Sequence, residues 1–144
     1  MGLLDTESVD AAPAVALGRI AWAGPLTVLT SLAAVHLVRQ VVLRLPHIQV
    51  DSGPLRVVPV TVDTVILCSI AVVVFTLFSA FHDDPIRRFR WIAFAALLVS
   101  FLPLVKIAEL PTTFGIGALH VAAYGPCVTL LPWAARERRV GHRG

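Results

Sequence analysis

Residues 110–135 form the part of the sequence that most constrains the fold. These 26 residues include no Asp, Glu, Lys or Arg, and His120 is the only titratable nitrogen side chain among them. As an α-helix the stretch would be about 39 Å long, at about 1.5 Å per residue. The hydrocarbon core of a bilayer is about 30 Å thick. The stretch therefore predicts a helix that spans a membrane.

Three further apolar stretches lie upstream. The sequence predicts spans at about residues 18–45, 60–81, 86–107 and 112–134. Only 15% of the residues are charged and 57% are hydrophobic, whereas soluble domains usually contain about 25% charged residues. Because four helices with short connections use nearly the whole chain, we predict an all-α fold. It is an integral membrane four-helix bundle of two antiparallel transmembrane hairpins.

One proline precedes the third predicted span and another lies inside it. Asp84 can cap a helix whose first residue is Pro85, since the missing N–H of proline is not needed there. This short turn predicts that the second and third spans form a hairpin. Pro103 removes the N–H that would bond the carbonyl of Val99.

The distribution of basic residues predicts how the chain is threaded. With four spans, both ends of the chain lie on one side of the membrane. That side collects eight basic residues and the other side four: Arg19, Arg87, Arg88, Arg90, Arg136, Arg138, Arg139 and Arg143 against Arg39, Arg44, Arg56 and Lys106. The positive-inside rule places both termini in the cytoplasm.

The tryptophans give a second indication of the same orientation. Trp22, Trp91 and Trp133 fall at the cytoplasmic ends of their predicted spans, where indole rings favour the membrane interface. Residues 1–17 are predicted to form a disordered acidic tail, and residues 136–144 a basic cytoplasmic tail.

The net charge of +3 does not point to a nucleic acid. The basic residues lie just beyond apolar spans, where orientation signals and anionic lipid explain them. Arg, Ala and Val are abundant and Lys106 is the only lysine, which is typical of a GC-rich bacterial genome. We therefore expect a multi-pass protein of the bacterial cytoplasmic (inner) membrane, with the lipid bilayer as its partner and no nucleic acid.

Ionisable side chains in the outer half of the membrane form a candidate polar cluster. Such residues are costly in lipid and often mark functional sites. With one tyrosine, the cluster comprises His36, Arg39, Asp63, Lys106, Glu109, His120 and Tyr124. The structural alternative is that its charged members sit at helix ends, solvated or paired, with Lys106 and Glu109 three residues apart on one helix face.

His120 and His36 allow a sharper hypothesis. His120 would lie about 13 Å below the outer surface, at about 1.5 Å per residue. A neutral imidazole bonded to Tyr124, or to a carbonyl freed by Pro103, is the structural interpretation. If the first helix reaches Leu45, His36 lies equally deep.

The two histidines could then ligate a haem b axially or share a metal with Asp63 or Glu109. Apart from that alternative, the sequence predicts no cofactor and no metal site.

Cys68 and Cys127 both fall inside predicted spans. Counting about 1.5 Å per residue from the outer surface places them at depths of about 12 Å and 24 Å. A disulfide needs Cα atoms within about 7 Å of each other. The sequence therefore predicts two separate buried thiols that act as small apolar groups.

Two short segments resemble a known family. The third span ends in the run from Leu97 to Pro103, LLVSFLP, and the fourth contains residues 118–123, ALHVAA. In these segments the chain is similar to domain-of-unknown-function group 6069, small four-span bacterial membrane proteins. The resemblance covers residues 18–134 and implies the four-helix fold, without an assigned activity.

Several signatures of enzymes are absent from the sequence. It has no nucleophile elbow, no phosphate-binding glycine loop, no HExxH and no paired-cysteine motif. We therefore predict a non-enzymatic protein: a subunit of a larger membrane complex or homo-oligomer, or a bundle that binds a small ligand. The alternative is a small redox or transport protein that uses the candidate polar cluster.

Overall fold

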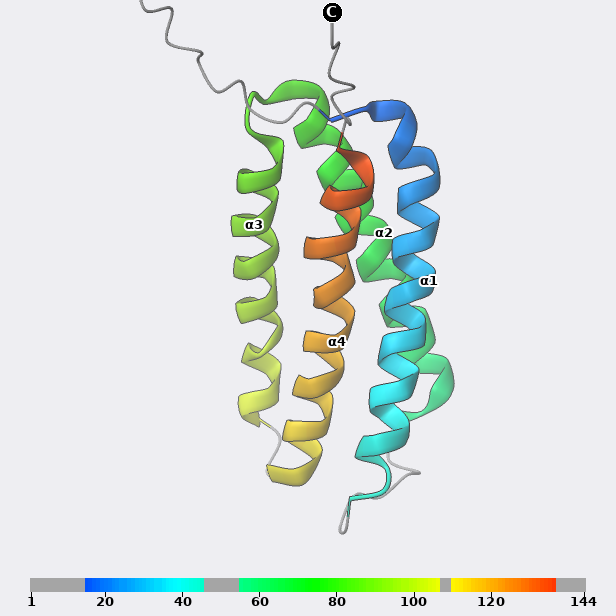
Figure 1. The fold of residues 1–144 in the computed structure, drawn as a ribbon. Helices are drawn as coiled ribbons and strands as arrows, with labels where there is room; N and C mark the ends of the chain where they lie inside the picture. Colours follow the sequence, from blue (N-terminus) through cyan, green and yellow to red (C-terminus); the bar gives the residue numbers. More distant parts are fainter. Residues whose placement is uncertain (1–14, 46–54, 107–109, 137–144) are drawn as a thin grey trace, which may run out of the picture.

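The structure is a computed structural model that describes residues 15–45, 55–106 and 110–136. This part of the chain forms four α-helices and one 3-10 helix: α1 (Leu17–Val42), α2 (Val57–Phe81), α3 (Pro85–Ser100), η2 (Leu102–Lys106) and α4 (Leu110–Ala135). The α-helices lie side by side as an elongated bundle (Figure 1). The described residues form no strand, so the predicted all-α fold class is confirmed.

Three of the helices, α1, α2 and α4, are long and apolar enough to cross a membrane. They contain 26, 25 and 26 residues. The third α-helix is shorter, with 16 residues, or about 24 Å. The five residues of η2 add about 10 Å, because a 3-10 helix rises about 2 Å per residue.

The third predicted span, 86–107, is not one continuous α-helix. The α-helix ends at Ser100. Two hydrogen bonds with the i to i−3 spacing of a 3-10 helix follow, from Phe101 N to Leu98 O and from Leu104 N to Phe101 O, both 3.1 Å. Pro103 has no N–H to donate to the Val99 carbonyl, so the α-helical hydrogen-bond pattern cannot continue there. The chain instead passes through the proline as the 3-10 helix η2.

The turn between α2 and α3 has the predicted cap. Asp84 precedes Pro85, the first residue of α3, and its Oδ1 accepts a hydrogen bond from the Arg87 N–H at 3.4 Å. In contrast, α2 begins at Val57, three residues earlier than predicted. Pro59 fits in its first turn because the N–H groups of that turn have no helical acceptor.

The first and last helices, α1 and α4, share the most extensive interface in the bundle. Their ends are joined by backbone: Ala16 N donates to Ala135 O at 3.0 Å, and Val15 pairs with Arg136 in an antiparallel bridge. Segments that are far apart in sequence are thereby held together at one end of the bundle.

The interior consists of two apolar clusters with a polar layer between them. One cluster comprises Ile20, Ala23, Phe75, Ile86, Phe89, Leu131, Ala134 and Ala135, and the other Val35, Val42, Leu55, Val60 and Leu119. Between them along their helices lie five buried residues with small polar groups, here called the central layer: Thr27, Ser31, Thr64, Cys68 and Cys127. The bundle therefore has small side chains at its middle.

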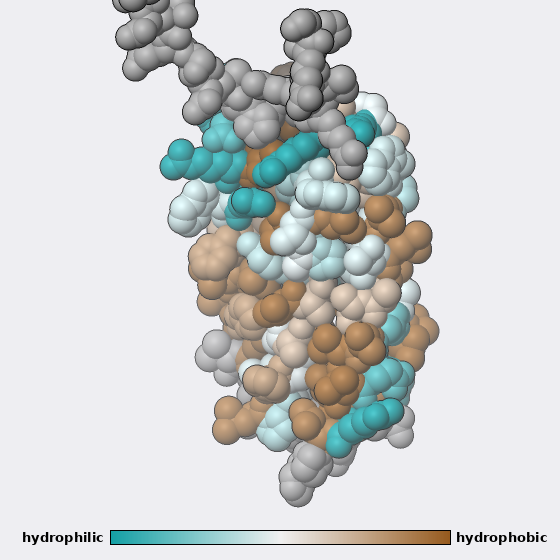
Figure 2. Space-filling view, in the orientation of Figure 1, coloured by the Kyte–Doolittle hydropathy of each residue, from teal (hydrophilic) through white to brown (hydrophobic). Residues whose placement is uncertain are grey.

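Large apolar side chains cover much of the outside. Leu37, Val58 and Phe81 are each more than two-thirds exposed. Hydrophilic residues gather at the end that carries the α2–α3 turn, with a smaller group toward the other end, and apolar residues lie between (Figure 2). Soluble monomers rarely expose so much apolar surface, and lipid is the solvent that suits it.

Gly24 allows α1 to approach α2 closely. A Cβ at this position would lie 2.9 Å from Val72 Cγ1, whereas a Cβ at Gly125 would meet no atom within 4 Å. We expect Gly24→Ala to destabilise the bundle by about 1–3 kcal/mol relative to Gly125→Ala, because the extra methyl overpacks the contact. Both variants gain the same helix propensity. Unfolding of the two proteins in mixed micelles measures the difference, and equal stabilities would contradict this packing.

Candidate functional site

His36 connects α1 to α2. Its Nε2 lies 3.0 Å from Thr61 Oγ1, and the Thr61 hydroxyl donates to the Val57 carbonyl at 2.8 Å. A hydroxyl has a single proton, so the His36 Nε2–H must be the donor in the contact with Thr61. This imidazole therefore serves as an interhelical link.

His120 is bonded within its own helix. Its Nδ1 lies 2.9 Å from the Ile116 carbonyl, and a carbonyl can only accept, so Nδ1 carries the proton. The predicted partners, Tyr124 or a carbonyl freed by Pro103, are not the ones found. The carbonyl one turn earlier on the same helix is always within reach, which explains the difference.

The two histidines contact different elements. The His36 ring bonds to Thr61 of α2, whereas the His120 ring stacks at an angle beside Phe101, with centroids 6.1 Å apart. The structure describes no contact between them, and its described residues include no group of three or more potential metal ligands. Axial ligation of a haem by His36 Nε2 would break the hydrogen bond between that nitrogen and Thr61. The haem hypothesis stays a prediction.

Among the described side chains of the candidate polar cluster, Arg39 is the buried charge. It is only 6% exposed, and its Nε donates to the buried carbonyl of Leu55 at 2.7 Å. The side chain therefore holds the last turns of α1 against the residues that lead into α2. Arg39 lies in the last turn of α1, as the structural alternative of a charge at a helix end expects, and its partner is a backbone carbonyl.

Of the three remaining charged members, the structure describes the side chain of Asp63 alone. Asp63 is exposed and lies in the second turn of α2, not the first, because the helix begins earlier than predicted. Lys106 ends η2, and Glu109 lies outside the described residues. The predicted pair of Lys106 and Glu109 therefore stays a prediction.

An open groove of about 520 Å³ lies between α3 and α4. From α3 it is lined by residues spaced three and four apart, which share one helix face. With one residue of α4, the lining comprises Asp84, Ile86, Arg87, Arg90, Trp91, Phe94 and Tyr124. Tyr124 is thus the one member of the candidate polar cluster that lines it.

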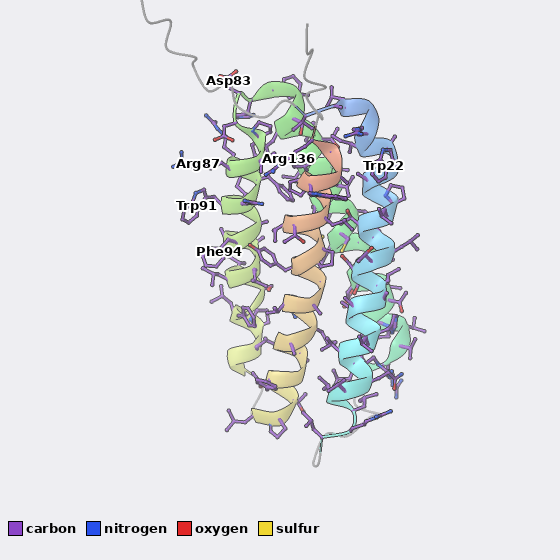
Figure 3. All side chains as sticks on the ribbon, viewed as in Figure 1. Trp22, Asp83, Arg87, Trp91, Phe94 and Arg136 are labelled. Atoms are coloured by element: carbon purple, nitrogen blue, oxygen red, sulfur yellow. The ribbon has the colours of Figure 1, made fainter. Side chains whose placement is uncertain are left out.

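The groove is amphipathic along its length. Arg87 and Arg90 lie near the start of α3, beside the Asp84 carboxylate. Two positive charges and one negative charge give this end of the groove a formal net charge of +1. Trp91 and Phe94 follow along the helix, and their rings meet edge to face with centroids 6.4 Å apart. The labelled side chains Arg87, Trp91 and Phe94 succeed one another along α3 (Figure 3). The groove can therefore accept an anionic group at one end and an apolar chain at the other.

The cysteines are also placed differently than predicted. Both are free, but Cys127 Sγ donates to Cys68 Sγ at 3.5 Å, so the estimate that put them at different depths is wrong. That estimate assumed that the spans begin at one level. The first turn of α2 lies higher in the view than that of α4 (Figure 1), and this offset brings the sulfurs together.

The chain matches no protein-family model, no curated protein and no solved structure. The resemblance to domain-of-unknown-function group 6069 therefore stays a prediction, and the site must be interpreted from its own chemistry.

Removing the Arg39 contact should weaken the fold. We expect Arg39→Gln to lower the free energy of unfolding by about 1.5–3 kcal/mol, the usual range for a charged hydrogen bond. Arg44 is exposed and two residues beyond α1, so Arg44→Gln is the matched control. Denaturant unfolding in micelles compares the two proteins, and equal losses would show that Arg39 acts only through its charge.

Proposed function

We propose that this protein is an integral four-helix bundle of the bacterial cytoplasmic membrane that holds an anionic amphiphile, such as a phospholipid, in the groove between α3 and α4. The observation that carries this proposal is the order of side chains along the groove. Two arginines come first and three aromatic rings follow.

The position of the groove along the bundle supports a lipid ligand. Trp22, Asp83, Arg87, Trp91 and Arg136 all lie toward the same end of the bundle (Figure 3). Tryptophan and arginine favour the headgroup region, and we place this end at the cytoplasmic surface by the positive-inside rule. In this arrangement α3 with η2, about 34 Å long together, provides the fourth crossing and completes two antiparallel hairpins.

The chemistry of the lining matches the two parts of a phospholipid. Guanidinium groups bind phosphate through paired hydrogen bonds, which Arg87 and Arg90 can supply. Trp91, Phe94 and Tyr124 follow and offer apolar contact to the first carbons of an acyl chain. Bulk lipid then covers the exposed apolar surface of the other helices. Further subunits or a second copy are not required to cover it.

Neutralising the groove arginines should weaken binding of anionic lipid. Each basic residue near a membrane surface contributes about 1 kcal/mol to attraction of anionic lipid, so the double change Arg87→Gln/Arg90→Gln should weaken binding roughly 30-fold. Arg88 is exposed and does not line the groove, which makes Arg88→Gln the matched control. Native mass spectrometry of the detergent-purified proteins, titrated with phosphatidylglycerol and with phosphatidylcholine, measures the retained lipid.

The outcomes separate a groove site from general attraction. Selective loss of phosphatidylglycerol in the double variant supports the proposal. Equal binding by the double variant and Arg88→Gln, or no preference for the anionic lipid in the natural protein, would overturn it. A co-purifying protein displaced by the double change would instead favour the role of a complex subunit.

The threading can be tested separately. In a protein with Cys68→Ala and Cys127→Ala, we expect Arg88→Cys to react with an impermeant maleimide only from the cytoplasmic side, and Arg44→Cys only from the outside. Both positions are exposed at opposite ends of their helices. Labelling intact cells and inverted vesicles gives the comparison, and labelling of both positions from one compartment would refute the four-span topology.

A further inference from the structure

The central layer holds two thiols in contact at the middle of the bundle. Cys68 of α2 and Cys127 of α4 are 1% and 6% exposed, and their sulfurs are 3.5 Å apart. Ser31 of α1 lies beside them, with its Oγ 3.9 Å from Cys127 Sγ. Ser31 also donates to the Ala123 carbonyl at 3.3 Å. Three helices therefore meet at this pair.

The geometry suits reaction between the two sulfurs. Reacting atoms held about 3–3.5 Å apart are in the range of a near-attack arrangement, in which the second group no longer has to be found by diffusion. A disulfide has a sulfur–sulfur bond of about 2.05 Å, so only a small approach of α2 and α4 is needed. These helices contact each other less extensively than α1 and α4 do, and the layer around the thiols consists of small residues.

The surroundings determine which product and which oxidant fit. A charged product would be costly between two apolar clusters, whereas a disulfide is neutral. The position between two apolar clusters of a membrane bundle also disfavours water-soluble thiol reagents such as glutathione, which maintain reduced cysteines in the cytosol. An oxidant that reaches this layer must dissolve in lipid and accept two electrons.

We propose that Cys68 and Cys127 are a redox pair that a lipid-soluble quinone converts to an intramembrane disulfide. The S–H bonds of both cysteines break and one S–S bond forms. The two electrons and two protons pass to the quinone, whose carbonyl oxygens become the hydroxyls of a quinol. No charge is left in the bundle. The bond would join α2 to α4, and thereby the first half of the chain to the second.

The proposal is independent of the lipid groove and shares only the membrane location with it. Reduced, purified protein in dodecylmaltoside micelles is mixed with a long-chain benzoquinone whose ring is fully substituted, so that thiols cannot add to it. We expect one quinol to form per protein, the intact mass to fall by two hydrogens, and alkylation by N-ethylmaleimide in denaturant to fall from both cysteines to neither. Sulfonated benzoquinone, which stays in water, is expected to react at least tenfold more slowly.

Two kinds of variant test the requirement for contact. Cys68→Ser and Cys127→Ser each leave one thiol, and both should form no quinol. Ile66 is exposed on α2, so Cys68→Ala/Ile66→Cys retains two thiols but turns one away from Cys127. This relocated pair should retain both alkylation sites.

The result on the natural protein does not depend on how the variants fold. Retention of both alkylation sites after treatment with the lipid-soluble quinone would overturn the proposal. So would equal oxidation of the relocated pair, or a covalent dimer in place of the internal bond. Loss of lipid binding by the groove variants would leave this outcome unchanged, so the two proposals can fail separately.

Discussion

The pairing of α1 with α4 is the contact on which the rest of the bundle depends. These helices are the first and last of the described chain, yet they share its most extensive interface. Small buried residues such as Ala23 and Ser31 allow the helix backbones to approach, and close approach is what favours helix association in lipid. Because α2 and α3 connect these two helices in the sequence, the contact also restricts where α2 and α3 can lie.

The interior is layered, with large apolar side chains in the two clusters and small side chains between them. The two apolar clusters contain the large rings and branched side chains, including the edge-to-face pair of Phe75 and Phe89, with centroids 5.0 Å apart. The central layer has only small side chains. Thr64 satisfies its hydroxyl on the Val60 carbonyl of its own helix, whereas Thr27 Oγ1 is buried and has no hydrogen-bond partner in the structure. The two thiols therefore lie in the layer of small side chains, between the two apolar clusters.

The sequence was sufficient for the elements but insufficient for their relative positions. Uninterrupted apolar stretches predict the long helices, and the run Asp84–Pro85 predicts the start of α3, because both signals are local. Pro103 predicts a break in the α-helix but not its position: α3 ends at Ser100, and the chain continues through the proline as η2.

The candidate polar cluster illustrates a different limit. Its members share a depth along the predicted spans, and depth does not determine the direction of a side chain around the helix axis. His36 therefore turned out to face α2, Asp63 the exterior and Tyr124 the groove. The spacing of Arg87, Arg90, Trp91 and Phe94 could have indicated the groove, since one helix face carries all four. The contact of the thiols was not predictable, because it depends on the offset between α2 and α4.

The backbone link between Ala16 and Ala135 has a topological consequence. The described chain begins and ends at the same point in space, so the bundle is nearly a closed ring of helices. A short peptide linking these two ends could close that ring, and new termini could be opened in the turn at Asp83 without changing any helix neighbour. The order in which the helices are synthesised would then be separable from the order in which they pack.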